Sequence, residues 1–119
     1  MNRRYALQPW VIRALIPPGI VGVYVLWSLT SPLYVGRSDT SLRRRLLEHA
    51  TAWPEIFFTY EVAHSPENAY AMECSLFHAL GDSTTNIDHP RRLTASDAPC
   101  GFCEVTFTQI REARLSLMQ

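Results

Sequence analysis

The sequence predicts an α+β fold in which a small central β-sheet is flanked by helices. Residues 20–29 and 56–63 are rich in β-branched and aromatic side chains, which favour strands. Residues 65–80 instead place apolar side chains at the three- and four-residue steps of a helix. With 119 residues, 47% of them hydrophobic, the chain can build one core but not two. We therefore expect one domain whose elements follow the order hairpin, helix, strand, helix.

The first 18 residues are expected to form an N-terminal arm, and the domain is expected to span residues 19–119. A short helical turn near Trp10 to Leu15 ends before Pro17-Pro18-Gly19, because proline cannot continue a helix. The sequence of this arm indicates no function.

A β-hairpin opens the predicted domain. Its first strand covers Ile20 to Leu29, and its second, shorter strand covers Leu33 to Gly36. Thr30-Ser31-Pro32 supplies the turn between them, since serine and proline favour turns.

The first predicted helix runs from about residue 42 to residue 50 and presents one apolar face to the sheet. Leu42, Leu46 and His49 share this face because they are spaced by helical steps. Three residues before the helix can accept its free amides as an N-cap: Asp39, Thr40 and Ser41.

The second predicted helix has the clearest boundaries in the sequence. Ser65 can cap its free amides, Pro66 stands where no amide partner is needed, and Gly81 ends it. Beyond it we expect a C-terminal extension at about residues 82–108, consisting of a polar loop and a last strand, followed by a terminal helix.

Composition favours a soluble, cytoplasmic protein without a membrane partner. No uninterrupted apolar stretch approaches the length of a membrane span, and residues 1–20 lack a signal-peptide core. Two of the three cysteines form Cys100-x-x-Cys103, a spacing that suits a metal or a redox pair better than a secreted disulfide framework.

The charges are distributed unevenly, although the net charge is zero. Residues 1–49 hold seven arginines against two carboxylates, whereas residues 50–104 hold eight carboxylates against two arginines. The N-terminal half is therefore the basic part. The chain contains arginine and no lysine. This choice favours forked contacts with phosphate, but an arginine-rich genome would produce the same bias.

One charged residue interrupts the apolar face of each predicted helix. Glu73 falls within the apolar stripe of the second helix, and Arg45 lies between the apolar positions of the first. A carboxylate that is turned inward needs a cation, a metal ion or an arginine as its partner. Two alternatives stay open at this point: a buried Arg45–Glu73 ion pair, or two side chains that reach to the rim of the core.

Two triplets bracket the predicted hairpin, Gly22-Val23-Tyr24 and Tyr34-Val35-Gly36, with nine residues between them. An ordered set follows: Ser38, the run Leu42-Arg43-Arg44-Arg45-Leu46-x-x-His49, Glu73 on a helix after a third strand, and Asn86 in a loop. Over roughly residues 19–90 this pattern resembles the GIY-YIG nuclease family.

The resemblance implies a metal-dependent endonuclease that hydrolyses phosphodiester bonds in nucleic acid, with DNA as the expected substrate. It implies that Glu73 binds a single Mg²⁺ or Mn²⁺ ion and that Arg45 contacts the scissile phosphate. It also implies that Tyr24 and Tyr34 line the cleft. Tyr24 then acts as general base or positions the attacking water, and the second role suits an unperturbed tyrosine better because its pKa is near 10.

Arg45 is preferred over its neighbours as the catalytic arginine because it keeps a three-residue step from Leu42 and a four-residue step to His49. His49 is expected to assist proton transfer, with a structural or surface role as the alternative, and Asn86 matches a family position only loosely. Three further residues are expected to contact the substrate: Gly36, Arg37 and Arg44. The alternative for Arg37 is a structural or surface role, and for Arg44 a solvated side chain.

A second metal site is expected at the back of the second helix. Cys74 and His78 are four residues apart and share a helix face, and with Cys100 and Cys103 they could form a closed, structural Zn²⁺ site. His89 is an alternative to His78. The opposing interpretation is that these are ordinary reduced cysteines and a surface histidine.

Two rival functions remain open beside the nuclease. One is a catalytically silent nucleic-acid-binding module with the same fold, and the other is a zinc-stabilised interaction protein built around Cys100 and Cys103. A nuclease domain this small is expected to obtain its specificity from a partner protein or from oligomerisation.

Overall fold

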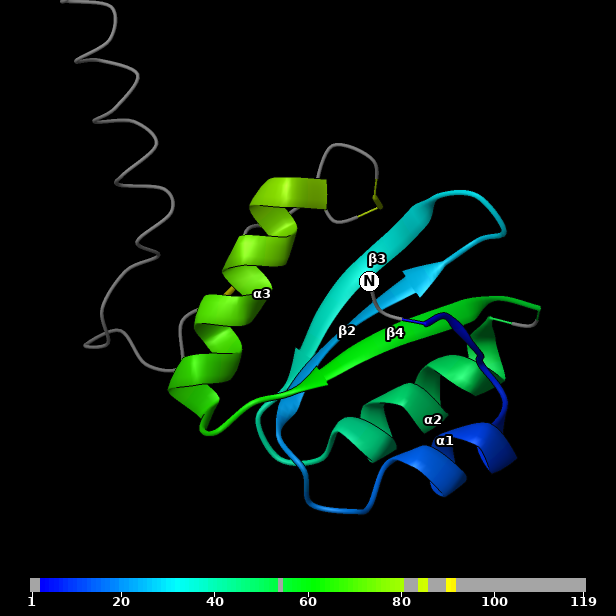
Figure 1. Ribbon diagram of the computed structural model, residues 1–119, viewed down its shortest axis with the longest axis horizontal. Helices are drawn as coiled ribbons and strands as arrows, with labels where there is room; N and C mark the ends of the chain where they lie inside the picture. Colours follow the sequence, from blue (N-terminus) through cyan, green and yellow to red (C-terminus); the bar gives the residue numbers. More distant parts are fainter. Residues whose placement is uncertain (1–2, 54, 81–83, 86–89, 92–119) are drawn as a thin grey trace, which may run out of the picture.

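The computed structural model describes residues 3–53, 55–80, 84–85 and 90–91. Within them the chain forms a four-stranded antiparallel sheet and three helices, which confirms the predicted α+β class (Figure 1). The strand order across the sheet is β1-β4-β2-β3, so that β3 is an edge strand. The elements are β1 (Tyr5–Ala6), α1 (Pro9–Leu15), β2 (Gly22–Trp27), β3 (Pro32–Ser38), α2 (Leu42–Ala52), β4 (Phe57–Val62) and α3 (Pro66–Leu80).

The hairpin of β2 and β3 forms where the sequence predicts it, but β2 is shorter than the predicted strand. Strand pairing ends at Trp27 because the hydroxyl of Ser28 accepts hydrogen bonds from the amides of Thr30 and Ser31, which turns the chain. At the other end, the carbonyl of Ile20 accepts a hydrogen bond from the first residue of α2 instead of one from a strand.

Two serines hold the junction between β3 and α2. Ser38 is buried, and its hydroxyl accepts hydrogen bonds from the amides of Thr40 and Ser41. Ser41 is the N-cap of α2, and its hydroxyl accepts a hydrogen bond from the amide of Arg44 at 3.3 Å. Of the three predicted caps, Ser41 is the one the helix uses.

The sheet has two faces with different partners. Tyr24 and Leu26 of β2 belong to a core with Leu42 and Leu46 of α2, which α1 completes. Because successive strand residues point to opposite faces, Val23 lies on the other side, where it packs with Ala69 of α3. Helices α1 and α2 therefore cover one face, and α3 lies against the other face beside β3 and β2 (Figure 1).

The segment predicted as an N-terminal arm packs into this core. Strand β1 pairs with β4, and α1 packs on α2. Leu7, Ile12 and Ile16 have relative exposures of at most 2%. Residues of this segment thus extend the sheet and cover the face that α2 leaves open.

Helix α3 begins as the sequence predicts. Pro66 is its first residue, and the hydroxyl of Ser65 accepts a hydrogen bond from the amide of Asn68 at 3.1 Å. The predicted helix end at Gly81 and most of the C-terminal extension lie outside the described residues.

Candidate active site

Gly36 allows Tyr24 to lie across the edge strand. The two residues are directly opposite each other in the β2–β3 ladder. A Cβ atom at Gly36 would collide with the ring and hydroxyl of Tyr24. Because Gly36 has no side chain, the Tyr24 ring can extend across β3 toward the sheet edge.

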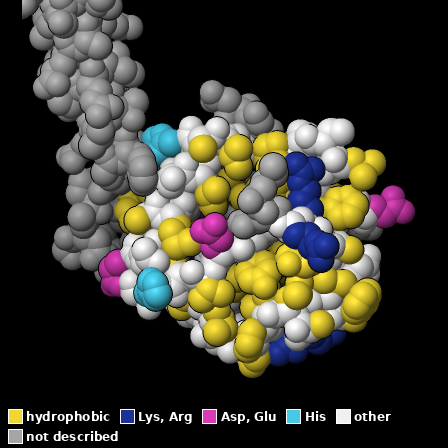
Figure 2. Space-filling view, in the orientation of Figure 1, with side chains coloured by type: hydrophobic (Ala, Val, Ile, Leu, Met, Phe, Trp, Pro, Cys, Tyr) yellow, Lys and Arg dark blue, Asp and Glu magenta, His cyan; other side chains and the backbone are white. Residues whose placement is uncertain are grey.

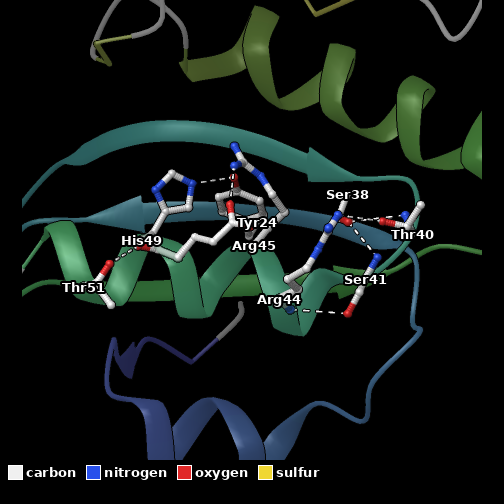
Figure 3. Close-up of polar contacts among 9 residues, drawn as sticks. Tyr24, Ser38, Thr40, Ser41, Arg44, Arg45, His49 and Thr51 are labelled. Carbon is white, nitrogen blue, oxygen red and sulfur yellow. Dashed lines mark hydrogen bonds and ion pairs between the residues drawn. The ribbon is translucent and has the colours of Figure 1, made fainter.

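The hydroxyl of Tyr24 meets the imidazole of His49, which belongs to α2. The oxygen lies 2.7 Å from Nε2, within hydrogen-bond distance (Figure 3). Tyr34 completes the cluster, with its ring centroid 6.2 Å from that of Tyr24 and 5.4 Å from that of His49. Three predicted site residues from β2, β3 and α2 thus lie together.

Arg45 is the arginine of α2 that acts on this cluster. It forms an ion pair with Glu48 at 2.9 Å, and its side chain is 36% exposed. Burial disfavours its charged form, but Tyr24, Glu48 and Tyr34 outweigh burial and raise the pKa of Arg45. The guanidinium is therefore a fixed positive charge beside the tyrosine hydroxyl (Figure 3).

Arg44, one residue earlier, is directed differently. It is exposed, and its guanidinium donates a hydrogen bond to the hydroxyl of Thr40 at 3.1 Å. Helical spacing distinguishes Arg44 from Arg45 in the sequence, and the two side chains have different surroundings in the structure.

Burial sets the protonation states of the Tyr24–His49 pair. It is the main reason that the pKa of Tyr24 is raised far above its ordinary value, although the charge of Arg45 opposes it. Burial is also the main cause of the lowered pKa of His49, followed by the charge of Arg45, while Glu48 acts in the opposite direction. At neutral pH the pair consists of a neutral phenol and a neutral imidazole.

Glu73 lies on the other side of the edge strand, where it contacts Arg37 of β3. The NH1 nitrogen of Arg37 lies 2.9 Å from Oε1 of Glu73, and the two side chains are only 10% and 13% exposed. The inward carboxylate that the sequence predicts is therefore present. Glu73 forms its ion pair with Arg37 of β3, and Arg45 forms its ion pair with Glu48. The arginine paired with Glu73 therefore comes from the strand and not from α2.

Arg37 has three further contacts that sequence reasoning missed. Its Nε lies 2.9 Å from Oδ1 of Asp39, its NH2 donates to the carbonyl of Arg91 at 2.6 Å, and its guanidinium lies 5.2 Å from the ring centroid of Tyr70. Arg37 and Asp39 are two residues apart at the end of a strand, which is the signal that could have placed them on one face. We call the side chains of Arg37, Asp39 and Glu73 the arginine–carboxylate cluster.

The two groups lie on opposite faces of β3. Tyr24 and Gly36 face α2, whereas Arg37 is paired in the ladder with Val23, on the face that α3 covers. The charge of Glu73 is the smallest of the causes that raise the pKa of Tyr24, after burial and Tyr34. The edge strand thus has a phenol, an imidazole and a guanidinium on one side and a carboxylate on the other.

Among the predicted site residues that the structure describes, the carboxylate of Glu73 is a donor that suits a hard divalent cation. Carboxylate oxygens are ligands that Mg²⁺ and Mn²⁺ accept, and phosphate oxygens and water can complete their coordination. Among the described residues, no group of three or more His, Cys, Asp or Glu side chains could hold a metal ion by itself.

The predicted zinc site falls only partly within the described residues. Cys74 is buried, whereas His78 is exposed on the same helix. Asn86, His89, Cys100 and Cys103 lie outside the described part of the chain. The zinc site therefore stays a prediction.

Arginine side chains are scattered over the face of the molecule shown in Figure 2. They form separate clusters with hydrophobic side chains between them. Within the described residues, no helix is long and apolar enough to cross a membrane.

Comparisons with protein-family models, with curated proteins and with solved structures found no match for this chain. The resemblance to GIY-YIG nucleases therefore rests on the residues of this chain alone.

Proposed function

We propose that this protein is a metal-dependent endonuclease of the GIY-YIG type that hydrolyses phosphodiester bonds in DNA. The observation that carries the proposal is the hydrogen-bonded Tyr24–His49 pair beside Arg45, with Glu73 just across the edge strand. A packed core would not require these polar groups to converge at a sheet edge. A phosphodiesterase uses each of them.

Tyr24 and His49 supply the proton transfer. With the imidazole protonated at Nδ1, the Tyr24 hydroxyl donates to Nε2 and can accept a hydrogen bond from the attacking water. As the water oxygen bonds to phosphorus and the bond to the leaving oxygen breaks, the water proton moves to the hydroxyl and the hydroxyl proton moves to His49. The raised pKa of Tyr24 makes it a relay rather than a preformed tyrosinate.

Arg45 and Glu73 supply the electrostatics. Arg45 holds a positive charge where negative charge develops on the phosphate oxygens. Glu73 would hold the Mg²⁺ or Mn²⁺ ion through its carboxylate. The ion, when bound, neutralises charge on the phosphate and on the leaving oxygen.

Arginines near the edge strand would bind the nucleic acid backbone. Arg44 is exposed beside the N-terminus of α2, where the helix dipole favours the negative charge of a phosphate. Gly36 contributes to this edge by leaving room for the ring and hydroxyl of Tyr24. The scattered arginines in Figure 2 suit a small footprint, so a partner protein or a second copy would add specificity. The proposal places the protein in the cytoplasm, where its cysteines stay reduced.

One observation favours a second candidate function, a nucleic-acid-binding module without catalysis. The Arg37–Glu73 ion pair gives the inward carboxylate a structural partner, so Glu73 does not need a metal ion to be stable. In that case the protein would bind DNA with the same affinity in the presence of Mg²⁺ or EDTA.

The two functions separate in one assay. Nicked, flapped, branched and linear DNA and a matched RNA set are incubated with the protein in Mg²⁺, Mn²⁺ or EDTA, beside Glu73→Ala. The nuclease proposal predicts cleavage of at least one substrate that requires the metal and is lost in the variant. Binding without cleavage across the whole panel would favour the silent module.

A further inference from the structure

The guanidinium of Arg37 lies between two carboxylates. Its NH1 and Nε nitrogens lie 2.9 Å from Oε1 of Glu73 and from Oδ1 of Asp39, respectively. Because both nitrogens belong to one planar guanidinium, the two carboxylates converge on a single charged group. The side chain of Arg37, which is 10% exposed, is this charged group.

The contact of Arg37 with Asp39 leaves one carboxylate oxygen without a hydrogen bond. Oδ1 of Asp39 is buried and has no hydrogen-bond partner among the described residues, so its contact with Arg37 is an ion pair without hydrogen-bond geometry. A buried carboxylate oxygen that accepts no hydrogen bond is costly. It retains the capacity to accept a stronger partner.

The charges of the arginine–carboxylate cluster also favour a further cation. Two carboxylates and one guanidinium sum to −1, which repels a phosphate and attracts a divalent cation. With a divalent cation added, the same groups sum to +1, which attracts a phosphate. A bound cation thus reverses the sign of the summed charge of these three side chains.

We propose that Arg37 competes with the divalent cation for Glu73 and thereby couples metal binding to nucleic acid binding. Arg37 holds Glu73 in the free protein. When the Glu73 carboxylate binds a cation, Arg37 releases this carboxylate and contacts a phosphate of the incoming nucleic acid. Asp39 keeps the guanidinium at the edge of the site. This inference rests on the proposed role of Glu73 as the metal ligand.

Coupling of this kind is reciprocal, so each ligand strengthens the binding of the other by the same factor. Free protein should bind the cation weakly because Arg37 must be displaced first. A phosphate that gives Arg37 a new partner removes that competition. Arg37 acts here as a positioning residue whose effect is seen in binding.

The test is calorimetric titration with Ca²⁺, which takes the same oxygen ligands, in the presence and absence of a short DNA duplex that is checked on gels for integrity. For the parent protein we expect DNA to tighten Ca²⁺ binding by about tenfold. Arg37→Met should bind Ca²⁺ more tightly without DNA and lose the effect of DNA. Arg13→Met removes an exposed arginine of α1 and should behave as the parent does.

The outcomes separate this inference from the proposed function. Equal Ca²⁺ affinity for Arg37→Met and the parent, with Glu73→Gln unable to bind, would overturn the competition and leave the metal site intact. Undiminished Ca²⁺ binding by Glu73→Gln would overturn the metal site itself. If Arg37→Met does not fold, Arg37→Lys replaces it. Lysine replaces the two guanidinium nitrogens that face Glu73 and Asp39 with one ammonium. Its hold on Glu73 should therefore weaken and Ca²⁺ should again bind more tightly than to the parent, and unchanged affinity would contradict the inference.

Discussion

The hydroxyl of Tyr24 lies 2.7 Å from Nε2 of His49, although the two residues are 25 positions apart and belong to a strand and a helix. Burial raises the pKa of the phenol and lowers that of the imidazole, so both are neutral when they meet. A neutral donor and a neutral acceptor form a relay through which a proton can pass.

Removing only the Tyr24 hydroxyl tests this relay. Tyr24→Phe keeps the ring over Gly36, so we expect a loss of about 1 kcal/mol in the free energy of unfolding. The rate of cleavage should fall by about 10²–10⁴-fold. Single-turnover cleavage and thermal melting measure the two effects. Tyr60→Phe, which removes a hydroxyl from a half-buried tyrosine of β4, is the matched control, and a rate as high as that control would eliminate Tyr24 from the reaction.

The pH dependence of cleavage should follow His49. Its imidazole must be neutral to accept a proton, and burial and the charge of Arg45 hold its pKa below the usual value of 6.5. The single-turnover rate should therefore rise with pH, with a midpoint below about pH 6.5, and then reach a plateau. His49→Asn should remove this acid limb together with most of the rate, and an unchanged acid limb in the variant would assign it to another group.

The same pKa shift has a consequence for stability. A histidine whose pKa is lowered by folding takes up protons more readily in the unfolded chain. The contribution of the neutral imidazole to the free energy of unfolding is therefore complete above about pH 6.5. That contribution is lost as pH falls from there through the folded pKa. Urea unfolding at several pH values should show a smaller acid destabilisation in His49→Asn than in the parent.

Gly36→Ala tests whether the edge strand must be open. The added methyl group would collide with the Tyr24 ring, so we expect a loss of about 1–3 kcal/mol in the free energy of unfolding and a displaced phenol. Gly19→Ala is the matched control, because Gly19 has a φ of 78° and no neighbour within 4 Å of an added Cβ. It should cost stability through backbone strain and leave the Tyr24 environment unchanged in NMR spectra. An unshifted Tyr24 signal in Gly36→Ala would contradict the packing argument.

Neighbouring arginines of α2 should have different roles. Arg45→Ala removes the charge beside Tyr24, so turnover should fall by about 10²–10³-fold with a smaller effect on DNA affinity. Arg44→Ala should mainly weaken DNA binding and its salt dependence, because that side chain is exposed. Steady-state kinetics and salt-dependent binding separate the two, and equal losses of turnover would show that the arginine assignment is wrong.

Local signals in the sequence were sufficient for most elements of the fold. Ser65 and Pro66 mark the start of α3 because an N-cap and a first-turn proline act within a few residues. The hairpin, α2 and β4 were also predicted, because their sequence signals likewise act within a few residues. The end of β2 was misplaced because the hydrogen bonds of Ser28 outweigh the strand preference of residues 28–29.

Long-range partners were harder to predict. The packing of Leu7, Ile12 and Ile16 depends on β1 pairing with β4, some 50 residues away, which no local pattern specifies. Helical periodicity correctly predicted that Glu73 is turned inward. It could not identify Arg37 as a partner, because that contact depends on which face of the sheet α3 covers.

In the proposed function, Glu73 binds the metal ion for phosphodiester cleavage. The most direct measurement is the single-turnover rate of DNA cleavage in Mn²⁺ for the parent and for Glu73→Gln, with melting temperatures measured in parallel. Glutamine keeps the size of the side chain and a carbonyl oxygen for Arg37, so the variant should fold. We expect a folded Glu73→Gln protein without detectable cleavage, whereas a folded variant that cleaves at the parent rate would show that Glu73 does not hold the metal ion.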